Sequence, residues 1–156
     1  MHGRADDAWM GEAIAIARDA LVHDEVPVGA VVVREGVVVA SASNRTVRDA
    51  DATAHAEVLA VRDASRVLGV SRLVGCTIYV TLEPCAMCAG ALVLARVDRV
   101  VFGAWDDKAG MAGSVGDLLR HPRLNHRADV RGGVRAEDCG ALLTEFFAAR
   151  RTARVT

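Results

Sequence analysis

The chain has 156 residues, of which 52% are hydrophobic and 25% are charged, and its formal net charge is −1. This composition excludes an intrinsically disordered chain, which would be poor in apolar residues. No apolar run reaches the roughly 18 residues that a membrane span requires. We therefore expect a single globular domain over residues 1–156 that acts in the cytoplasm and does not contact a membrane.

The N-terminal part predicts a helix followed by a β-hairpin. Apolar residues recur at helical spacing from Trp9 to Leu21, with charged residues between them, which indicates an amphipathic helix. Two valine-rich runs at residues 28–33 and 37–40 are separated by a short turn and predict the hairpin. Because both runs are continuously apolar, we expect both faces of the two strands to be covered.

The middle of the chain predicts a helix, a strand and another helix. After a polar loop, Thr53 is placed to cap a helix that continues to Leu68. Residues 77–81 are rich in β-forming side chains. Pro84 then opens a helix predicted over residues 85–96, since proline is favoured at a helix start.

The C-terminal part predicts two strands and a last helix. A fourth strand is expected over residues 99–104 and a short fifth strand near 129–131, with a glycine-containing loop between them. The last helix contains Leu142, Leu143 and the pair Phe146-Phe147. The mixed order of strands and helices indicates an α/β fold, with helices on both faces of one sheet.

Three side chains have the chemistry and spacing of a catalytic zinc site. Cys85 and Cys88 are three residues apart at a predicted helix start, so they share a helix face and can bind one ion. His55 lies at the start of another predicted helix and can complete a set of three ligands. Three protein ligands leave a tetrahedral zinc with one position for water, the arrangement of catalytic sites. Glu57, two residues from His55, is the candidate general base.

Each of these residues also has a simpler interpretation when it is considered alone. A single histidine at a helix start is more often a cap, and a glutamate in a first turn is favoured by the helix dipole. Cys76 and Cys139 could supply a fourth ligand and close a structural site. Buried thiols that pack as small hydrophobes are the more frequent case, and we expect that for both residues.

The order His55-Ala56-Glu57 and then Pro84-Cys85-Ala86-Met87-Cys88 matches the signature of the zinc-dependent deaminases, in which tRNA adenosine deaminases are known examples. Further stretches from residues 25–31 to Phe146-Phe147 are similar to the bacterial tRNA-specific adenosine deaminases (the TadA family). The resemblance covers about residues 8–151.

This resemblance implies a three-layer α/β/α cytidine deaminase-like fold with a five-stranded mixed sheet, assembled as a homodimer. It implies hydrolysis of adenosine to inosine at the wobble position of tRNA, in bacteria that of arginine tRNA with anticodon ACG. His55, Cys85 and Cys88 would bind one Zn²⁺ per subunit. Glu57 would transfer the proton. The positions implied to contact the target base or the anticodon loop are Asn44, Val28, Ala30, Asp106, Lys108, Phe147 and Arg151.

Two residues depart from the family pattern and leave the contacts to flanking bases open. Leu21 stands where relatives often have a bulky aromatic residue, and Trp105 stands where a basic residue is common. The charge distribution is compatible with a polyanionic substrate, since residues 120–156 contain 8 arginines and 4 acidic residues.

Two other functions remain possible from the sequence. One is deamination of a free base or nucleoside such as guanine or cytosine, which requires the same zinc signature. The other is a non-catalytic zinc module that binds RNA, which predicts a closed site with four ligands.

Overall fold

The computed structural model describes residues 2–155 and contains the four helices and five strands expected from the sequence, in the expected order. The elements are α1 (His2–Leu21), β1 (Gly29–Arg34), β2 (Val37–Ser43), α2 (Ala56–Leu68), β3 (Cys76–Leu82), α3 (Ala86–Leu94), β4 (Arg99–Ala104), β5 (Asp129–Arg131) and α4 (Ala136–Val155).

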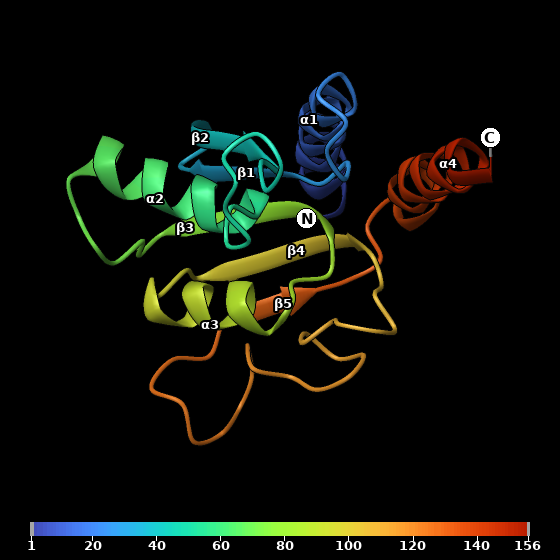
Figure 1. The fold of residues 1–156 in the computed structure, drawn as a ribbon. Coiled ribbons are helices and arrows are strands. Elements are labelled where there is room, and N and C mark those ends of the chain that lie inside the picture. Colours follow the sequence, from blue (N-terminus) through green and yellow to red (C-terminus); the bar gives the residue numbers. More distant parts are fainter. Residues whose placement is uncertain (1, 156) are drawn as a thin grey trace.

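The strands form one mixed sheet in the order β2-β1-β3-β4-β5 (Figure 1). β1 is antiparallel to both β2 and β3, whereas β3, β4 and β5 are parallel to one another. Parallel neighbours need crossover connections, and α3 supplies the one between β3 and β4. The five-stranded mixed sheet predicted from the family resemblance is confirmed.

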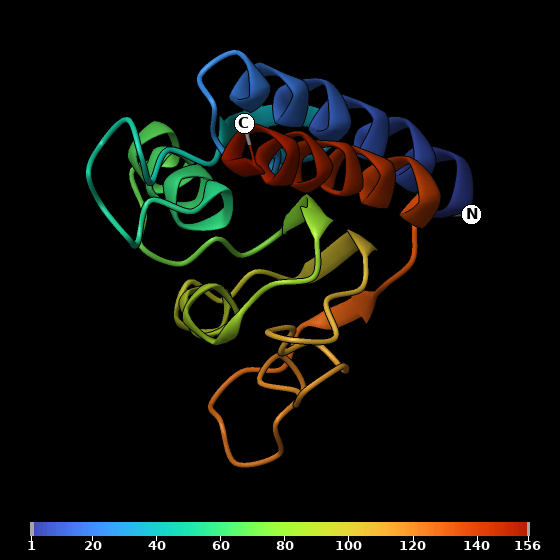
Figure 2. The ribbon, with the colours of Figure 1, turned by 45° about the vertical axis from the view of Figure 1, so that its right-hand side comes forward.

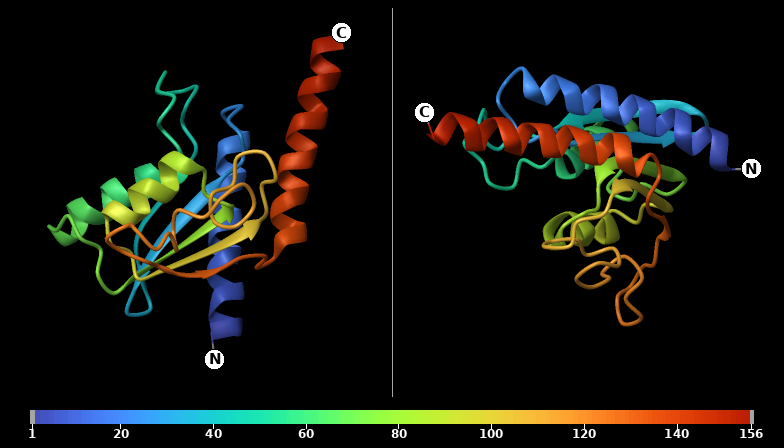
Figure 3. Two further views of the ribbon diagram at one scale, coloured as in Figure 1. Left: turned by 90° about the horizontal axis from the view of Figure 1, so that it is seen from below. Right: turned by 90° about the vertical axis from the view of Figure 1, so that its right-hand side faces the viewer.

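Helices cover both faces of the sheet and make three layers. α1 and α4 lie side by side on one face, and α2 and α3 lie on the other (Figures 2 and 3). Successive side chains of β1 point to opposite faces of the sheet, so β1 contributes to both cores. Ala30 and Val32 pack in the core beneath α2 and α3, whereas Val31 and Val33 pack against α1. The continuously apolar strand at residues 28–33 is therefore covered on both faces, as expected.

The prediction of two covered faces is wrong for the second strand of the hairpin. β2 is an edge strand, and Val37 and Val38 at its start are exposed. Both α1 and α2 pack on β2, where Ala40 is buried, but its first two residues, next to the hairpin turn, lie at the sheet edge outside this cover. Apolar content alone could not distinguish this edge strand from β1.

Two predicted helix starts also differ from the structure. Thr53 does not cap α2, because its hydroxyl donates to Asp51 Oδ1 at 2.7 Å and the N-cap position is His55. α3 begins at Ala86 with Cys85 as its N-cap, so Pro84 precedes the helix and does not form its first turn. Both corrections place a predicted zinc ligand at the N-cap.

None of the helices within residues 2–155 combines the length and apolar character needed to cross a membrane.

Candidate active site

The N-termini of α2 and α3 bring His55, Cys85 and Cys88 together. His55 Nδ1 lies 3.7 Å from Cys85 Sγ and 3.4 Å from Cys88 Sγ, and the three ligand atoms lie within 4.8 Å of one another. A tetrahedral zinc with ordinary Zn–N and Zn–S bonds would separate such nitrogen and sulfur atoms by about 3.6 Å. The observed spacing therefore fits zinc, and in residues 2–155 no other group of this kind can hold a metal ion.

The electrostatics place one negative charge on the thiol pair, at Cys85, and a bound cation would let Cys88 lose its proton as well. Hydrogen bonds from Cys88 and His55 lower the pKa of the Cys85 thiol from 9.0 to about 3. The contact with Cys85 and burial together raise the pKa of Cys88. Both ligand-bearing helices direct their N-terminal backbone N–H groups toward this corner, which stabilises negative charge on the sulfur atoms.

Glu57 lies in the first turn of α2, and its side chain is only 5% exposed. Burial raises the pKa of this carboxyl from 4.5 to about 7. A carboxyl group that titrates near neutral pH can both accept and return a proton, which is the property needed in a general base that later acts as an acid. The structure places Glu57 beside the ligand group, as the spacing to His55 predicts.

A cavity of about 220 Å³ opens beside the ligand group. His55, Cys85 and Glu57 form one side, and Asn44 and Val28 also contribute to the wall. Asn44 is almost fully buried. Ala30, expected in the wall, is fully buried in the core and is not among the lining residues.

A wider groove of about 610 Å³ continues from this cavity, and Asp106 lines both. Lys108 and Trp105 line the groove from the loop after β4, and Phe147 and Arg151 line it from α4. Four of these residues were predicted to contact substrate. Trp105 departs from the pattern of the resembled family, and its side chain is 52% exposed. Leu21, the other departure, lines neither cavity.

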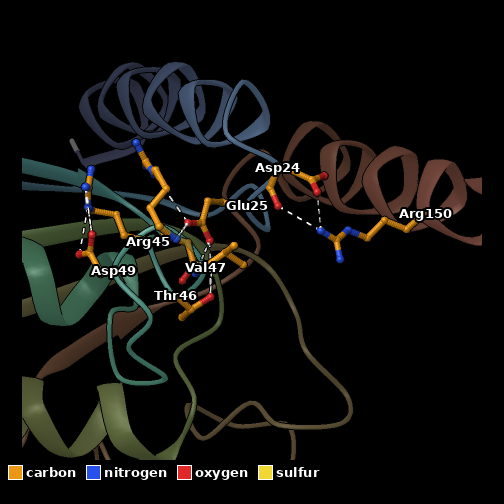
Figure 4. Close-up of polar contacts among 9 residues, drawn as sticks. Asp24, Glu25, Arg45, Thr46, Val47, Asp49 and Arg150 are labelled. Atoms are coloured by element: carbon orange, nitrogen blue, oxygen red, sulfur yellow. Dashed lines mark hydrogen bonds and ion pairs between the residues drawn. The ribbon is translucent and has the colours of Figure 1, made fainter.

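The orientation of α4 decides which aromatic residue faces the groove. Phe146 is buried, and the Arg150 guanidinium lies 4.8 Å from its ring centroid. Arg150 also donates to Asp24 Oδ2 at 2.9 Å, which ties α4 to the loop after α1 (Figure 4). Phe147, one residue later, is 45% exposed on the groove side. Phe146 and Arg150 anchor the helix, and the residues that directly follow them, Phe147 and Arg151, face the groove.

Two buried glutamates were missed as site residues by the sequence reasoning. Glu25 accepts hydrogen bonds from the backbone N–H groups of Val47 and Arg48 at 3.0 and 2.8 Å, next to the segment that contains Asn44 (Figure 4). Glu83 accepts hydrogen bonds from the loop after β4. Glu83 directly follows the apolar strand β3, and Glu25 lies in the stretch 25–31 that resembles the family, but neither signal shows that the side chain is buried. The donors lie 22 to 31 residues away, so the sequence does not reveal them.

The other two cysteines do not join the metal-ligand group. Cys76 at the start of β3 and Cys139 in α4 are both buried. Burial raises the pKa of each thiol, for Cys139 to about 11. Both therefore remain protonated and pack as small apolar side chains, as predicted. A fourth cysteine or histidine ligand is not present among the described residues, which leaves the three-ligand arrangement.

Comparisons with known proteins agree on the type of protein. Residues 4–151 match the family model described as MafB19-like deaminase. The chain is 49% identical over 142 residues to the tRNA-specific adenosine deaminase of Bacillus subtilis (strain 168), covering 91% of this chain and 88% of that one. A solved structure from a study of A-to-I editing by tRNA:A34 deaminases at the wobble position of transfer RNA is 44% identical, with a TM-score of 0.81 over 84% of this chain and 95% of that one.

More distant or longer proteins also match. The guanine deaminase of Nitrosomonas europaea is 26% identical, with a TM-score of 0.80 over 91% of this chain and 84% of that one. A tRNA(Ile)-lysidine synthase of Deinococcus deserti (strain DSM 17065 / CIP 109153 / LMG 22923 / VCD115) is 47% identical over 96% of this chain, but this chain spans only 28% of its length.

Proposed function

This chain belongs to the family of tRNA-specific adenosine deaminases, and we propose that it hydrolyses adenosine at the wobble position of a tRNA anticodon to inosine and ammonia. The proposal rests on one observation: Glu57 is buried beside a three-ligand group and lines the same cavity. The two tRNA deaminases compared above are 49% and 44% identical to the chain, whereas the guanine deaminase is 26% identical, which favours tRNA over a free base.

We propose that the ligand group holds one Zn²⁺ per subunit through His55, Cys85 and Cys88. One imidazole and two thiolates suit a borderline-soft divalent cation, and the distances between the ligand atoms fit tetrahedral geometry. Bound there, zinc would lower the pKa of water and so make a nucleophile available near neutral pH.

In the proposed reaction, Glu57 takes the proton that the attacking water loses as its oxygen bonds to C6 of the adenine. Glu57 then delivers a proton to N1 of the ring. A second proton transfer through Glu57 converts the 6-amino group into ammonia as the C6–N6 bond breaks. The pKa of about 7 lets this one carboxyl group act in both directions.

The remaining predicted site residues would bind the RNA. Asn44 would hydrogen-bond the adenine edge, and Val28 would pack against the base inside the cavity. A base must leave its stack to enter such a cavity, which costs less in a loop than in a duplex. The residues proposed to contact the nucleotides outside the cavity are Asp106, Lys108, Phe147 and Arg151.

Several properties of the protein follow as part of this proposal. Arginine tRNA with anticodon ACG is the proposed substrate, and the cytoplasm is the proposed location. Residues 1–156 are proposed to act as one deaminase domain.

We also propose a homodimer, supported by exposed apolar side chains near the C-terminal ends of α2 and α3, which include Val67, Val70 and Leu94. Light scattering of the purified protein, with Leu94→Asp as the variant, tests the dimer.

The activity is tested with an anticodon stem-loop of arginine tRNA. The protein is incubated with this RNA, and sequencing shows whether the first anticodon letter is then read as guanosine. Glu57→Gln preserves side-chain size and should lower turnover by about 10²–10⁴-fold, the usual contribution of a general acid–base group. Metal analysis of the same variant should give one zinc per chain, as in the wild type.

The two alternatives predict other outcomes in the same experiment. A free-base deaminase would convert guanine, cytosine or adenosine and leave the stem-loop unchanged. A non-catalytic RNA-binding zinc module would bind the stem-loop equally well with or without Glu57 and would convert nothing. Either result would refute the proposed function.

A further inference from the structure

Glu83 has a buried carboxylate that the proposed reaction does not use. Its side chain is 2% exposed, and it lies two residues before the ligand Cys85. Oε1 accepts the Asp106 N–H at 2.9 Å, and Oε2 accepts the Ala112 and Ser114 N–H groups, each at 3.0 Å. The Ser114 hydroxyl donates to Oε1 as well. All four donors come from one loop, residues 105–116.

Backbone hydrogen bonds also join Glu83 and Pro84 to the end of β4 and to the loop that follows it. The Glu83 N–H donates to the Ala104 carbonyl at 2.9 Å, and the Met111 N–H donates to the Pro84 carbonyl at 2.8 Å. Gly110 lies so close that a Cβ there would be 2.3 Å from the Glu83 carboxyl carbon. The 105–116 loop is therefore wrapped around the carboxylate, directly beside the turn that presents Cys85.

The loop held in this way presents two of the proposed substrate residues. Asp106, whose N–H binds Glu83, lines both the cavity and the groove. Its own carboxylate accepts the N–H groups of Lys108 and Ala109 at 3.1 and 3.2 Å, which sets the turn that presents Lys108. A chain of contacts thus runs from the ligand turn through Glu83 to Asp106 and then to Lys108.

We propose that Glu83 is a positioning residue for substrate binding, which holds Asp106 and Lys108 at a set place relative to the metal ligands. The inference rests on the proposed function. Within residues 2–155 none of the ion pairs includes Glu83, so its charge is stabilised by the loop donors. Hydrogen bonds from backbone N–H groups depend on direction, and they fix the path of a loop that has little regular structure.

Glu83→Gln is the main test because it retains size but not acceptor capacity. Whichever oxygen the amide nitrogen replaces, an NH₂ group then faces a backbone N–H donor. We expect KM for the stem-loop to rise about tenfold or more with kcat changed less than about threefold, because a group that positions substrate affects binding more than chemistry. Ser114→Ala removes only the hydroxyl donor, so it should raise KM less and fold normally.

Asp6→Asn is the matched control, since Asp6 is another buried carboxylate held by hydrogen bonds. It contacts Arg99 at the start of β4, whereas the 105–116 loop follows the end of that strand. This variant should lose thermal stability without any change in KM. If Glu83→Gln and Asp6→Asn have the same KM, the effect of Glu83 on substrate binding does not go beyond its effect on stability, and the proposal is refuted.

A double-mutant cycle tests whether Glu83 acts through its loop. Lys108→Ala should raise KM in the wild type and have little further effect in Glu83→Gln, because Lys108 is already displaced there. Equal effects in both backgrounds would overturn the proposal. A KM within twofold of the wild type in both Glu83→Gln and Ser114→Ala would do the same.

One readout does not depend on activity. The chain has two tryptophans, so Trp9→Phe leaves Trp105, inside the loop, as the only tryptophan, whose emission can be excited selectively. Glu83→Gln should increase acrylamide quenching of Trp105, and Asp6→Asn should not. Unchanged quenching would refute the proposed positioning of the loop. If the wild type fails to convert the stem-loop, the proposed function is refuted and the substrate role of Glu83 with it, whatever the quenching shows.

Discussion

A buried ionic cluster far from the cavity predicts a pH-dependent part of the stability. Asp6 of α1 is fully buried, and its carboxylate accepts hydrogen bonds from Arg99 at 2.6 and 2.7 Å and from Arg131 at 2.7 Å. The Tyr79 hydroxyl donates a further bond at 3.0 Å. This cluster connects α1 to β3, β4 and β5, so its loss should weaken the packing of α1 on the sheet.

The pKa of Asp6 sets the magnitude. Burial alone would raise this pKa, but the hydrogen bonds from the arginines and the tyrosine outweigh burial and lower it from 3.8 to about 2. At about 1.4 kcal/mol per pKa unit, the lowered pKa corresponds to about 2 kcal/mol of folding free energy at pH 7. Because the folded pKa is the lower one, this stability is present above about pH 4 and is lost as the pH falls toward 2.

Asp6→Asn removes this contribution and leaves two arginines without their carboxylate. We expect the free energy of unfolding in urea at pH 7 to be about 2–4 kcal/mol lower for the variant than for the wild type, which overlaps the roughly 3–5 kcal/mol typical of breaking a buried ion pair. At pH 3 about half of the roughly 2 kcal/mol from the Asp6 carboxylate is lost. The difference in unfolding free energy between the two proteins should therefore be smaller at pH 3 than at pH 7 by that amount.

Asp7, the exposed neighbour of Asp6, supplies the control. Asp7→Asn should change the unfolding free energy by no more than about 0.5 kcal/mol. The reasoning is refuted if Asp6→Asn matches the wild type at pH 7. It is also refuted if the gap between the two proteins is the same at pH 7 and pH 3.

Three further predictions concern packing, RNA contacts and the metal. Gly29→Ala would place a Cβ 2.2 Å from the Ala13 carbonyl oxygen, so thermal unfolding should show a loss of about 2–3 kcal/mol in folding stability. Gly140 has open space around it, so Gly140→Ala should be neutral or stabilising. Lys108→Ala and Arg151→Ala should each reduce the slope of log binding constant against log salt by about 0.7–0.9 in fluorescence anisotropy, and an unchanged slope would exclude a phosphate contact. Dialysis against a strong chelator should abolish turnover and added Zn²⁺ should restore it, so full turnover by the chelated protein would contradict a metal-dependent reaction.

The fold class and the ligand group could be predicted because both depend on local patterns. The runs of valine and the helical spacing around Trp9 place strands and helices without knowledge of their neighbours. Cys85 and Cys88 need only one turn of helix to come together, and the spacing of His55 and Glu57 is equally local. The family signature then assigns these four residues to one site, and the structure brings the three ligands together and places His55, Cys85 and Glu57 on the wall of one cavity.

The two adjacent phenylalanines show where local patterns are insufficient. Phe146 and Phe147 have the same chemistry, and neighbouring positions on a helix point in different directions. Phe146 is buried on the side of α4 where Arg150 lies over its ring and binds Asp24 in the loop after α1. Phe147 consequently faces the groove. Family resemblance pointed to Phe147, whereas residue type alone would have placed it in the core.

By itself, the sequence determined the order of the elements, the layers of the fold and the three candidate metal ligands, since each follows from periodicity or short spacing. Only the tertiary structure decided that β2 is an edge strand, that His55 and not Thr53 begins α2, and that Glu25 and Glu83 are buried. The physical reason is that a buried carboxylate keeps its charge only where donors surround it. For both glutamates those donors come from segments more than 20 residues away, which meet the carboxylate only after the chain has folded.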